Sequence, residues 1–173
     1  MSALSICYFV LLFPLAFILH DAEEVIVQHR WMLSNRNKLE ERFPKLKSIV
    51  NHLSTLDTPS FAIAAAEELV IIMLATGYVL IQGRHSMEIW AALFLAFTFH
   101  QLIHILQGVM LRGYVPGLCT ELLLLPYSYL GVKSIALAMH GVELMLWAFL
   151  GILFMVLNLR FAHWIGKLCH QRT

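Results

Sequence analysis

The chain has 173 residues, of which 60% are hydrophobic and only 13% are charged. A soluble domain carries about 25% charged residues, so this composition indicates a membrane protein. The formal net charge of +1 provides no basic field for nucleic acid, which argues against nucleic-acid binding. The three cysteines, Cys7, Cys119 and Cys169, have no zinc-ribbon spacing and imply no disulfide framework.

Five apolar segments are candidates for membrane insertion: residues 4–27, 60–81, 87–111, 117–130 and 134–159. The first has no basic residue before it and no small-residue cleavage site after it, so we expect a retained span rather than a signal peptide. Thr58 and Pro59 predict the start of the second, as a capping hydroxyl followed by proline.

The fourth segment is short, about fourteen residues with Pro126 inside, and fits either a tilted span or a re-entrant piece. The other four have the length needed to cross the hydrocarbon core of a bilayer. The sequence therefore predicts an all-α transmembrane helical bundle of four to five spans. We expect residues 1–173 to form a single membrane-embedded domain.

The positions of the basic residues predict the orientation. With five spans and the N-terminus outside, ten of the twelve Lys and Arg residues fall inside, and only Arg84 and Lys133 fall outside. If the fourth segment does not cross, the division becomes eight to four. The positive-inside rule thus favours five spans, with the N-terminus outside and the C-terminus cytoplasmic, in the plasma (inner) membrane.

Residues 28–58 form the one long polar stretch, which this topology places in the cytoplasm. Five apolar residues recur there at helical spacing among Lys and Arg: Leu39, Phe43, Leu46, Val50 and Leu53. A basic amphipathic helix bent at Pro44, lying on the anionic membrane surface, would show this pattern. A solvated helix packed on the bundle is the alternative.

Ionisable residues within the predicted spans are the strongest functional signal, because a charge at bilayer depth costs several kcal/mol. His20, Glu23 and Glu24 stand at i, i+3 and i+4 and share one helical face. His100 and His104 are an i, i+4 pair, the spacing by which one helix presents two imidazoles to a single ion.

Depth brings these residues together with two further acids. Counted at 1.5 Å per residue from the cytoplasmic ends, six residues lie roughly 6–18 Å deep: His20, Glu24, Glu68, His100, His104 and Glu121. Glu67 and Glu68 are about 100° apart around their helix, so we expect only one to face the interior. His140 and Glu143 lie near the outer end of the fifth segment, and we exclude them from the site.

Several carboxylates and three imidazoles on four elements resemble the ligand set of a carboxylate-bridged dinuclear metal centre. A mononuclear zinc site with Glu as general base is equally open. The simplest alternative is a hydrogen-bonded network that holds the helices together. No Lys or Arg lies within the predicted spans near these acids, which favours a bound cation or protons.

The residues His20-Asp21-Ala22-Glu23-Glu24 resemble the motif that names the HXXEE family of integral membrane proteins. The later histidines His100 and His104 match the family's histidine-bearing span. The pattern Tyr-x-Pro-Gly-x-x-Thr, here Tyr114, Pro116, Gly117 and Thr120, is similar to a third family feature. The resemblance covers the first through the fourth segment and implies a metal-binding or enzymatic membrane protein.

We therefore expect a membrane-embedded metal-dependent enzyme, of the hydrolase or oxidase/hydroxylase class, acting on a lipid or other apolar substrate. The expected ligands of a divalent ion, zinc or iron, are His20, Glu24, Glu68, His100, His104 and Glu121. Glu23, as a proton shuttle, and Tyr114, as a proton donor or substrate contact, are the expected catalytic groups; an interfacial anchor is the alternative for Tyr114. The alternative function is a small transporter or sensor that binds a metal ion or relays protons through the same cluster.

Overall fold

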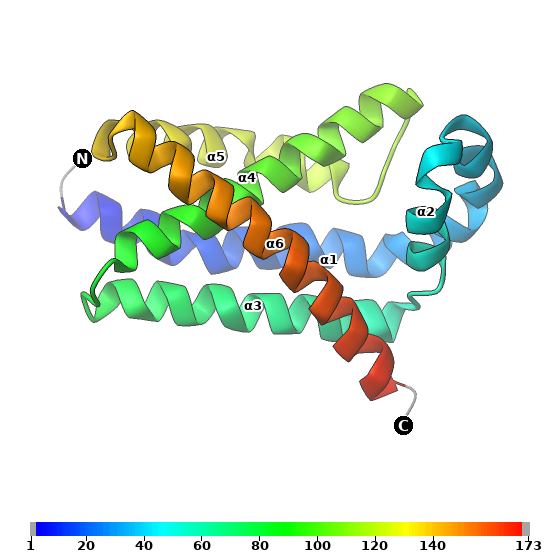
Figure 1. Ribbon diagram of the computed structural model, residues 1–173, viewed down its shortest axis with the longest axis horizontal. Helices are drawn as coiled ribbons and strands as arrows, with labels where there is room; N and C mark the ends of the chain where they lie inside the picture. The colour runs from blue at the N-terminus through cyan, green and yellow to red at the C-terminus, as the bar shows by residue number, and fades with distance from the viewer. Residues whose placement is uncertain (1–2, 171–173) are drawn as a thin grey trace.

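The computed structural model describes the backbone of residues 3–170 and the side chains of residues 8–169, and this part of the chain is helical without strands. The helices are α1 (Ala3–Arg42), α2 (Lys47–Ser54), α3 (Thr58–Leu80), α4 (Ser86–Leu111), α5 (Leu118–Ala138) and α6 (Gly141–His170), with a 3-10 turn, η1 (Pro44–Leu46). The five long helices alternate in direction along the long axis of the molecule, and α2 folds back beside the end of α1 (Figure 1). The all-α prediction is confirmed.

Three helices, α3, α4 and α6, are long and apolar enough to cross a membrane, judged on the described residues. The chain is therefore a membrane protein. Part of the first predicted span, residues 4–27, falls on side chains outside the described range. That segment is the N-terminal part of α1, a helix of 40 residues that continues to Arg42. The helix ends there because Pro44 follows, and proline cannot continue a helix.

The structure differs from the prediction at the fourth and fifth segments. Helix α5 has 21 residues and continues through Pro126 to Ala138, and α6 begins only at Gly141. Residues 134–138 therefore belong to the fourth helix, which is about 31 Å long rather than short. Proline removes one N–H from the helical ladder, a loss that membrane helices tolerate, and the break falls instead at Met139, whose backbone is extended.

The start of α3 is capped one residue earlier than predicted. The Asp57 side chain, not the Thr58 hydroxyl, accepts a hydrogen bond from the Ser60 N–H at 3.0 Å, and Pro59 occupies the first turn.

Helix α6 crosses α3 and α4 diagonally (Figure 1). Its glycines allow close approach: a Cβ at Gly151 would lie 2.1 Å from the Ala92 carbonyl oxygen, and one at Gly166 would lie 2.1 Å from that of Ser60. Small residues at such crossings let helix backbones pack without a side chain between them. This packing brings α6 over the interior faces of α3 and α4.

The apolar residues of the polar stretch 28–58 pack against one another and against the bundle. The first half of this stretch is the end of α1. Met32, Leu39 and Val50 are buried together, and three partly buried side chains pack against them: Phe43, Leu53 and Leu111. Leu46, which shares the predicted pattern, is exposed instead. The observed packing matches the alternative of a helix packed on the bundle, and contact of this segment with the membrane surface stays a prediction.

Candidate metal centre

The centre begins with one face of α1. His20 and Glu24 are one helical turn apart and both buried, with His20 fully enclosed. Their side chains meet, since His20 Nε2 lies 3.8 Å from Glu24 Oε2. The i, i+4 spacing in the sequence therefore places an imidazole and a carboxylate side by side, as predicted.

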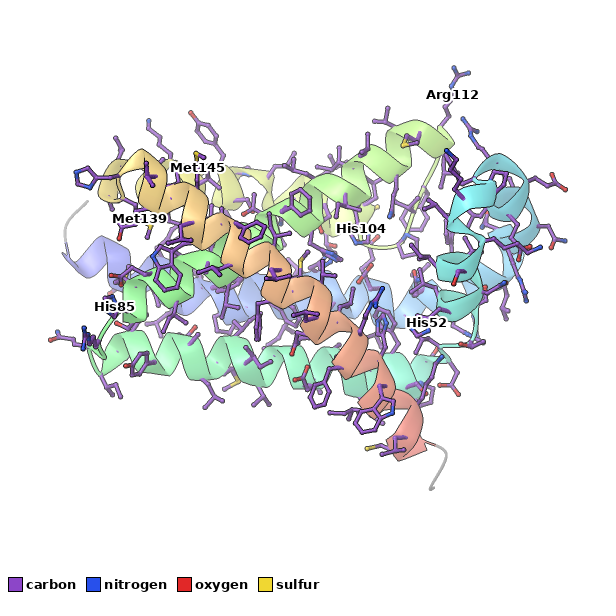
Figure 2. All side chains as sticks on the ribbon, viewed as in Figure 1. His52, His85, His104, Arg112, Met139 and Met145 are labelled. Carbon is purple, nitrogen blue, oxygen red and sulfur yellow. The ribbon has the colours of Figure 1, made fainter. Side chains whose placement is uncertain are left out.

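Helix α4 supplies two more imidazoles to the same point. His104 Nε2 lies 2.9 Å from His100 Nε2 and 3.2 Å from Glu24 Oε1. One donor atom from each of His20, Glu24, His100 and His104 lies within 4.8 Å of the others. Figure 2 places His104 between α4 and α1, far from His85 and Met139 at the end of the bundle. Four of the six predicted ligands therefore share one site.

Glu121 reaches this site from the first turn of α5. Its carboxylate is fully buried, and Oε1 lies 3.1 Å from His20 Nδ1. The Gln101 side chain also lies beside this carboxylate. Glu121 therefore contacts the ring nitrogen of His20 that faces away from Glu24.

Glu68 lies next to the centre rather than in it. It lines a cavity of about 80 Å³ between α1, α3, α4 and α6, which Asp21, Glu24 and His100 also line. Glu67, its neighbour, accepts a hydrogen bond at 3.1 Å from Asn158 Nδ2 of α6. We expected only one of the two to face the interior. Glu68 lines the cavity, and Glu67 contacts Asn158, which lines it too.

Glu23 is held by the loop and first turn that precede Glu121. Its Oε1 accepts hydrogen bonds from the Tyr114 hydroxyl at 2.6 Å and from the Cys119 N–H at 3.4 Å. Its Oε2 accepts from the Thr120 N–H at 2.8 Å and is 2.7 Å from the Thr120 hydroxyl. A carboxylate here caps the free N–H groups of α5 and complements the positive end of its dipole.

Tyr114 is fixed by the same contacts. Trp31 Nε1 donates to its carbonyl at 3.0 Å while its hydroxyl donates to Glu23. Burial, together with the hydrogen bond to the Glu23 carboxylate, raises the pKa of the Tyr114 phenol above its usual range. The phenol therefore remains protonated at neutral pH.

The Pro-Gly turn has a steric role at the centre. Gly117 is the N-cap of α5 and has φ +83, a backbone conformation that favours glycine. A Cβ at this position would lie 2.7 Å from His20 Cε1 and 3.4 Å from Glu24 Cγ. Glycine is therefore required both by the turn and by the ring packed against it.

Several polar residues at or near the site were not predicted. Asp21 lines the cavity and stands three residues before Glu24, a spacing that the sequence already contained. Gln101 is fully buried, accepts a hydrogen bond from the Ser128 hydroxyl, and lies beside the Glu121 carboxylate. Nothing in the sequence distinguishes Gln101 from an ordinary helical glutamine.

The donor set fits a divalent ion. Imidazole and carboxylate ligands suit zinc and iron, and a tetrahedral zinc ion with bonds of about 2.0–2.1 Å separates its ligand atoms by about 3.3 Å. Three contacts at the centre, of 2.9, 3.2 and 3.8 Å, lie around that value, and the four ligand atoms all lie within 4.8 Å of one another. His20 Nε2 is buried without a hydrogen bond in the described part of the chain, so polar capacity at the site is unfilled.

The residues excluded from the site lie elsewhere. His140 is exposed in the turn between α5 and α6, and Glu143 lines a different cavity. That turn lies at the same end of the bundle as the start of α1 (Figure 1).

The chain was compared with known proteins. A family model described as a protein of unknown function with HXXEE motif matches residues 11–131, a range that includes both the α1 motif and the Tyr114–Thr120 turn. No curated protein and no solved structure matches the chain. The predicted resemblance is confirmed, and the chain belongs to the family of proteins of unknown function with the HXXEE motif.

Proposed function

We propose that this protein is a membrane-embedded metal-dependent enzyme that acts on a lipid or other apolar substrate. The convergence of His20, Glu24, His100 and His104 within 4.8 Å of one another, next to a cavity in the bundle, carries the proposal. A polar network would also hold helices together, but it needs donors and acceptors in balance. Here carboxylates and imidazoles meet with unfilled capacity.

The local charges support a cation. Asp21, Glu24 and Glu68 line the same small cavity, and its lining includes no Lys or Arg. Like charges at bilayer depth are costly unless a cation or protons compensate them. A divalent ion, zinc or iron, compensates two carboxylates at once. When bound, such an ion would polarise a carbonyl group or lower the pKa of a water molecule.

Each residue has a task in this proposal. His20, Glu24, His100 and His104 hold the ion, and Glu68 is a further ligand or proton acceptor from the cavity side. The Glu121 carboxylate, 3.1 Å from His20 Nδ1, would orient the ring so that Nε2 is the ligand atom. Tyr114 remains the proposed proton donor or substrate contact.

Glu23 fits a positioning role better than the proton shuttle expected from the sequence. Both of its oxygens already accept hydrogen bonds from residues 114–120. Those bonds fix the start of α5, and with it Glu121 and Gly117, against His20. A proton shuttle would have to exchange these partners during each turnover.

The cavity supports an apolar substrate. Beyond its acids and His100, it is lined largely by apolar side chains, including Phe61, Leu93, Phe97 and Phe154. Its volume of about 80 Å³ is below the roughly 300–1,000 Å³ of small-molecule sites, so it would take only the reacting end of an apolar substrate, whose polar group faces Glu24 and His100. Hydrolysis and oxidation both remain within this proposal.

The topology belongs to the same proposal. Five spans, with the N-terminus outside and the C-terminus cytoplasmic in the plasma (inner) membrane, agree with the alternating directions of the long helices and with the basic residues. A reporter fused after Thr173 should be active only on the cytoplasmic side. Activity on the outer side alone would reject five spans.

Elemental analysis of the full chain purified in mild detergent tests the function. We expect zinc or iron bound in a stoichiometric amount, lost on chelation and restored by adding the metal. Hydrolysis or oxidation of lipid substrates by the metal-loaded protein, abolished by chelator, would support the enzyme. Metal-driven uptake by proteoliposomes without turnover would favour the transporter alternative. Protein that purifies without metal and ignores chelators would overturn both metal-based functions and leave a proton relay or a structural network.

A further inference from the structure

A second cavity lies at the end of the bundle that carries the α3–α4 and α5–α6 turns. Its volume is about 460 Å³, and its walls come from α1, α4, α5 and the start of α6. Met139, which lines it, and His85, in the α3–α4 turn, mark this end in Figure 2, well away from His104. The size lies within the roughly 300–1,000 Å³ of small-molecule sites. Of the residues at the candidate metal centre, none lines it.

The interior of this cavity is apolar and aromatic. Phe9 and Trp90 form one wall, with ring centroids 6.0 Å apart in an edge-to-face arrangement, and Ile135 and Met139 lie among the other lining residues. Such walls accommodate an apolar body, and the indole face of a tryptophan attracts a cation.

Two carboxylates from different helices complete the lining. Glu88 lies in the first turn of α4 and Glu143 in the first turn of α6, while no Lys, Arg or His lines the cavity. Glu88 Oε1 is 3.2 Å from His85 Nδ1, whereas Glu143 forms no hydrogen bond or ion pair within the described chain. The charge of the lining therefore complements a cation.

Trp90 adds an unfilled donor. The side chain is 2% exposed, and its Nε1 has no acceptor among the described residues. A buried N–H without a partner costs free energy that an acceptor on an occupant would recover. The cavity thus combines an apolar chamber, an aromatic wall, two carboxylates and one free donor.

We propose that this cavity binds a cationic amphiphile that carries an ammonium group and a neighbouring ester oxygen, the chemistry of an acylated amino alcohol. The acyl chain lies in the chamber, the ammonium group meets Glu143 and Glu88, and the ester oxygen accepts from Trp90. The site is separate from the metal centre, so the proposal does not depend on the proposed function.

Isothermal titration calorimetry on the full chain in a neutral detergent tests this site. The probe is octanoylcholine, and the matched control is 3,3-dimethylbutyl octanoate, which has the same shape and ester but no charge. We expect saturable binding of the choline ester and affinity lower by about tenfold or more for the uncharged ester. Binding should be unchanged in Glu41→Gln, a substitution of an exposed carboxylate at the far end of α1.

Three variants assign the contacts. Glu143→Gln should weaken octanoylcholine binding by about tenfold, and Glu143→Asp should restore most of it. Trp90→Phe should weaken both esters because it removes the donor and keeps a ring. Equal affinity for the two esters in wild type, or no saturable binding, would overturn the proposal and indicate a groove filled by lipid chains. The wild-type comparison decides alone if a variant does not fold.

Discussion

Within the described residues, histidines gather in two clusters whose surroundings differ in charge. At the candidate metal centre, His20 and His104 meet Glu24 and Glu121. Near the C-terminal end of α6, His52 Nε2 and His163 Nδ1 lie 3.2 Å apart. Among the described residues, no carboxylate forms an ion pair with either histidine. Imidazole rings thus lie close together in both clusters, but carboxylates contact them only in the first.

The second cluster joins helices. Lys167 Nζ donates to the Thr55 hydroxyl at 2.6 Å, next to the His52–His163 contact, so α6 is tied to α2 and its following turn. Burial, followed by the positive charges of Lys167 and Arg160, lowers the pKa of His52. A cationic neighbourhood repels a metal ion, whereas the carboxylates around His20 attract one. His163 lines the cavity beside the centre and His52 does not, so His52 is the natural control for the centre around His20.

The largest expected effect is loss of metal in His100→Ala. Wild type should be stabilised by about 2.7 kcal/mol at a metal concentration a hundredfold above Kd, because the ion binds only the folded state. His100→Ala should bind no metal, and added metal should no longer raise its melting temperature. Elemental analysis and thermal unfolding with and without metal measure this.

His52→Ala is the matched control and should keep the wild-type metal content and response. Equal metal binding by His100→Ala and wild type would show that the convergence around His20 is a structural network. Loss of metal in His52→Ala as well would erase the distinction between the two clusters.

Gly117→Ala should perturb the centre from outside its ligand set. A left-handed conformation costs a non-glycine residue about 1–3 kcal/mol, and the new Cβ would meet the ring of His20. We expect a lower melting temperature and weaker metal binding. Gly77→Ala, at a helical glycine with open space around it, is the control and should change neither. Wild-type affinity in Gly117→Ala would mean that His20 is not a ligand.

Glu23→Gln separates positioning from proton transfer. The amide nitrogen of the new glutamine cannot accept a hydrogen bond, so one of the two backbone N–H groups that now donate to Glu23 would lose its acceptor. We therefore expect α5 to shift and metal affinity to fall by about 10–100-fold. Tyr114→Phe removes one hydrogen bond and should cost about 1 kcal/mol of stability with a smaller loss of metal. Metal titrations of both variants are the measurement. A shuttle role predicts intact metal binding in Glu23→Gln with loss of turnover alone.

The smallest effect concerns pH at the control cluster. The pKa of His52 is lowered in the folded state, so its contribution to stability is present above the ordinary imidazole pKa of 6.5 and is lost as pH falls. Between about pH 7.5 and about pH 5.5, the melting temperature of metal-loaded wild type should decrease. His52→Gln should decrease less over the same range. An identical decrease in both would place the titration elsewhere.

Local pattern predicted much of the fold because it depends on neighbours in the chain. The starts of α3 and α4 lie within two residues of the predicted segments, and the spacing of His20, Glu24, His100 and His104 correctly placed each pair on one helix face. The end of α5 was not predictable from its proline. In a soluble protein, a proline such as Pro126 indicates the end of a helix. Membrane helices tolerate proline, and α5 continues past it to Ala138.

The sequence by itself determined the helical membrane class, the HXXEE family and the residue types of the candidate centre, since hydropathy, helical spacing and motif are properties of the chain. Only the tertiary structure decided which residues meet. Glu23 bonds to Tyr114, 91 residues away, and Gly117 packs on His20, while Glu68 faces the cavity. These choices depend on how α5 and α3 are turned about α1, and packing between distant segments fixes that rotation rather than any local pattern.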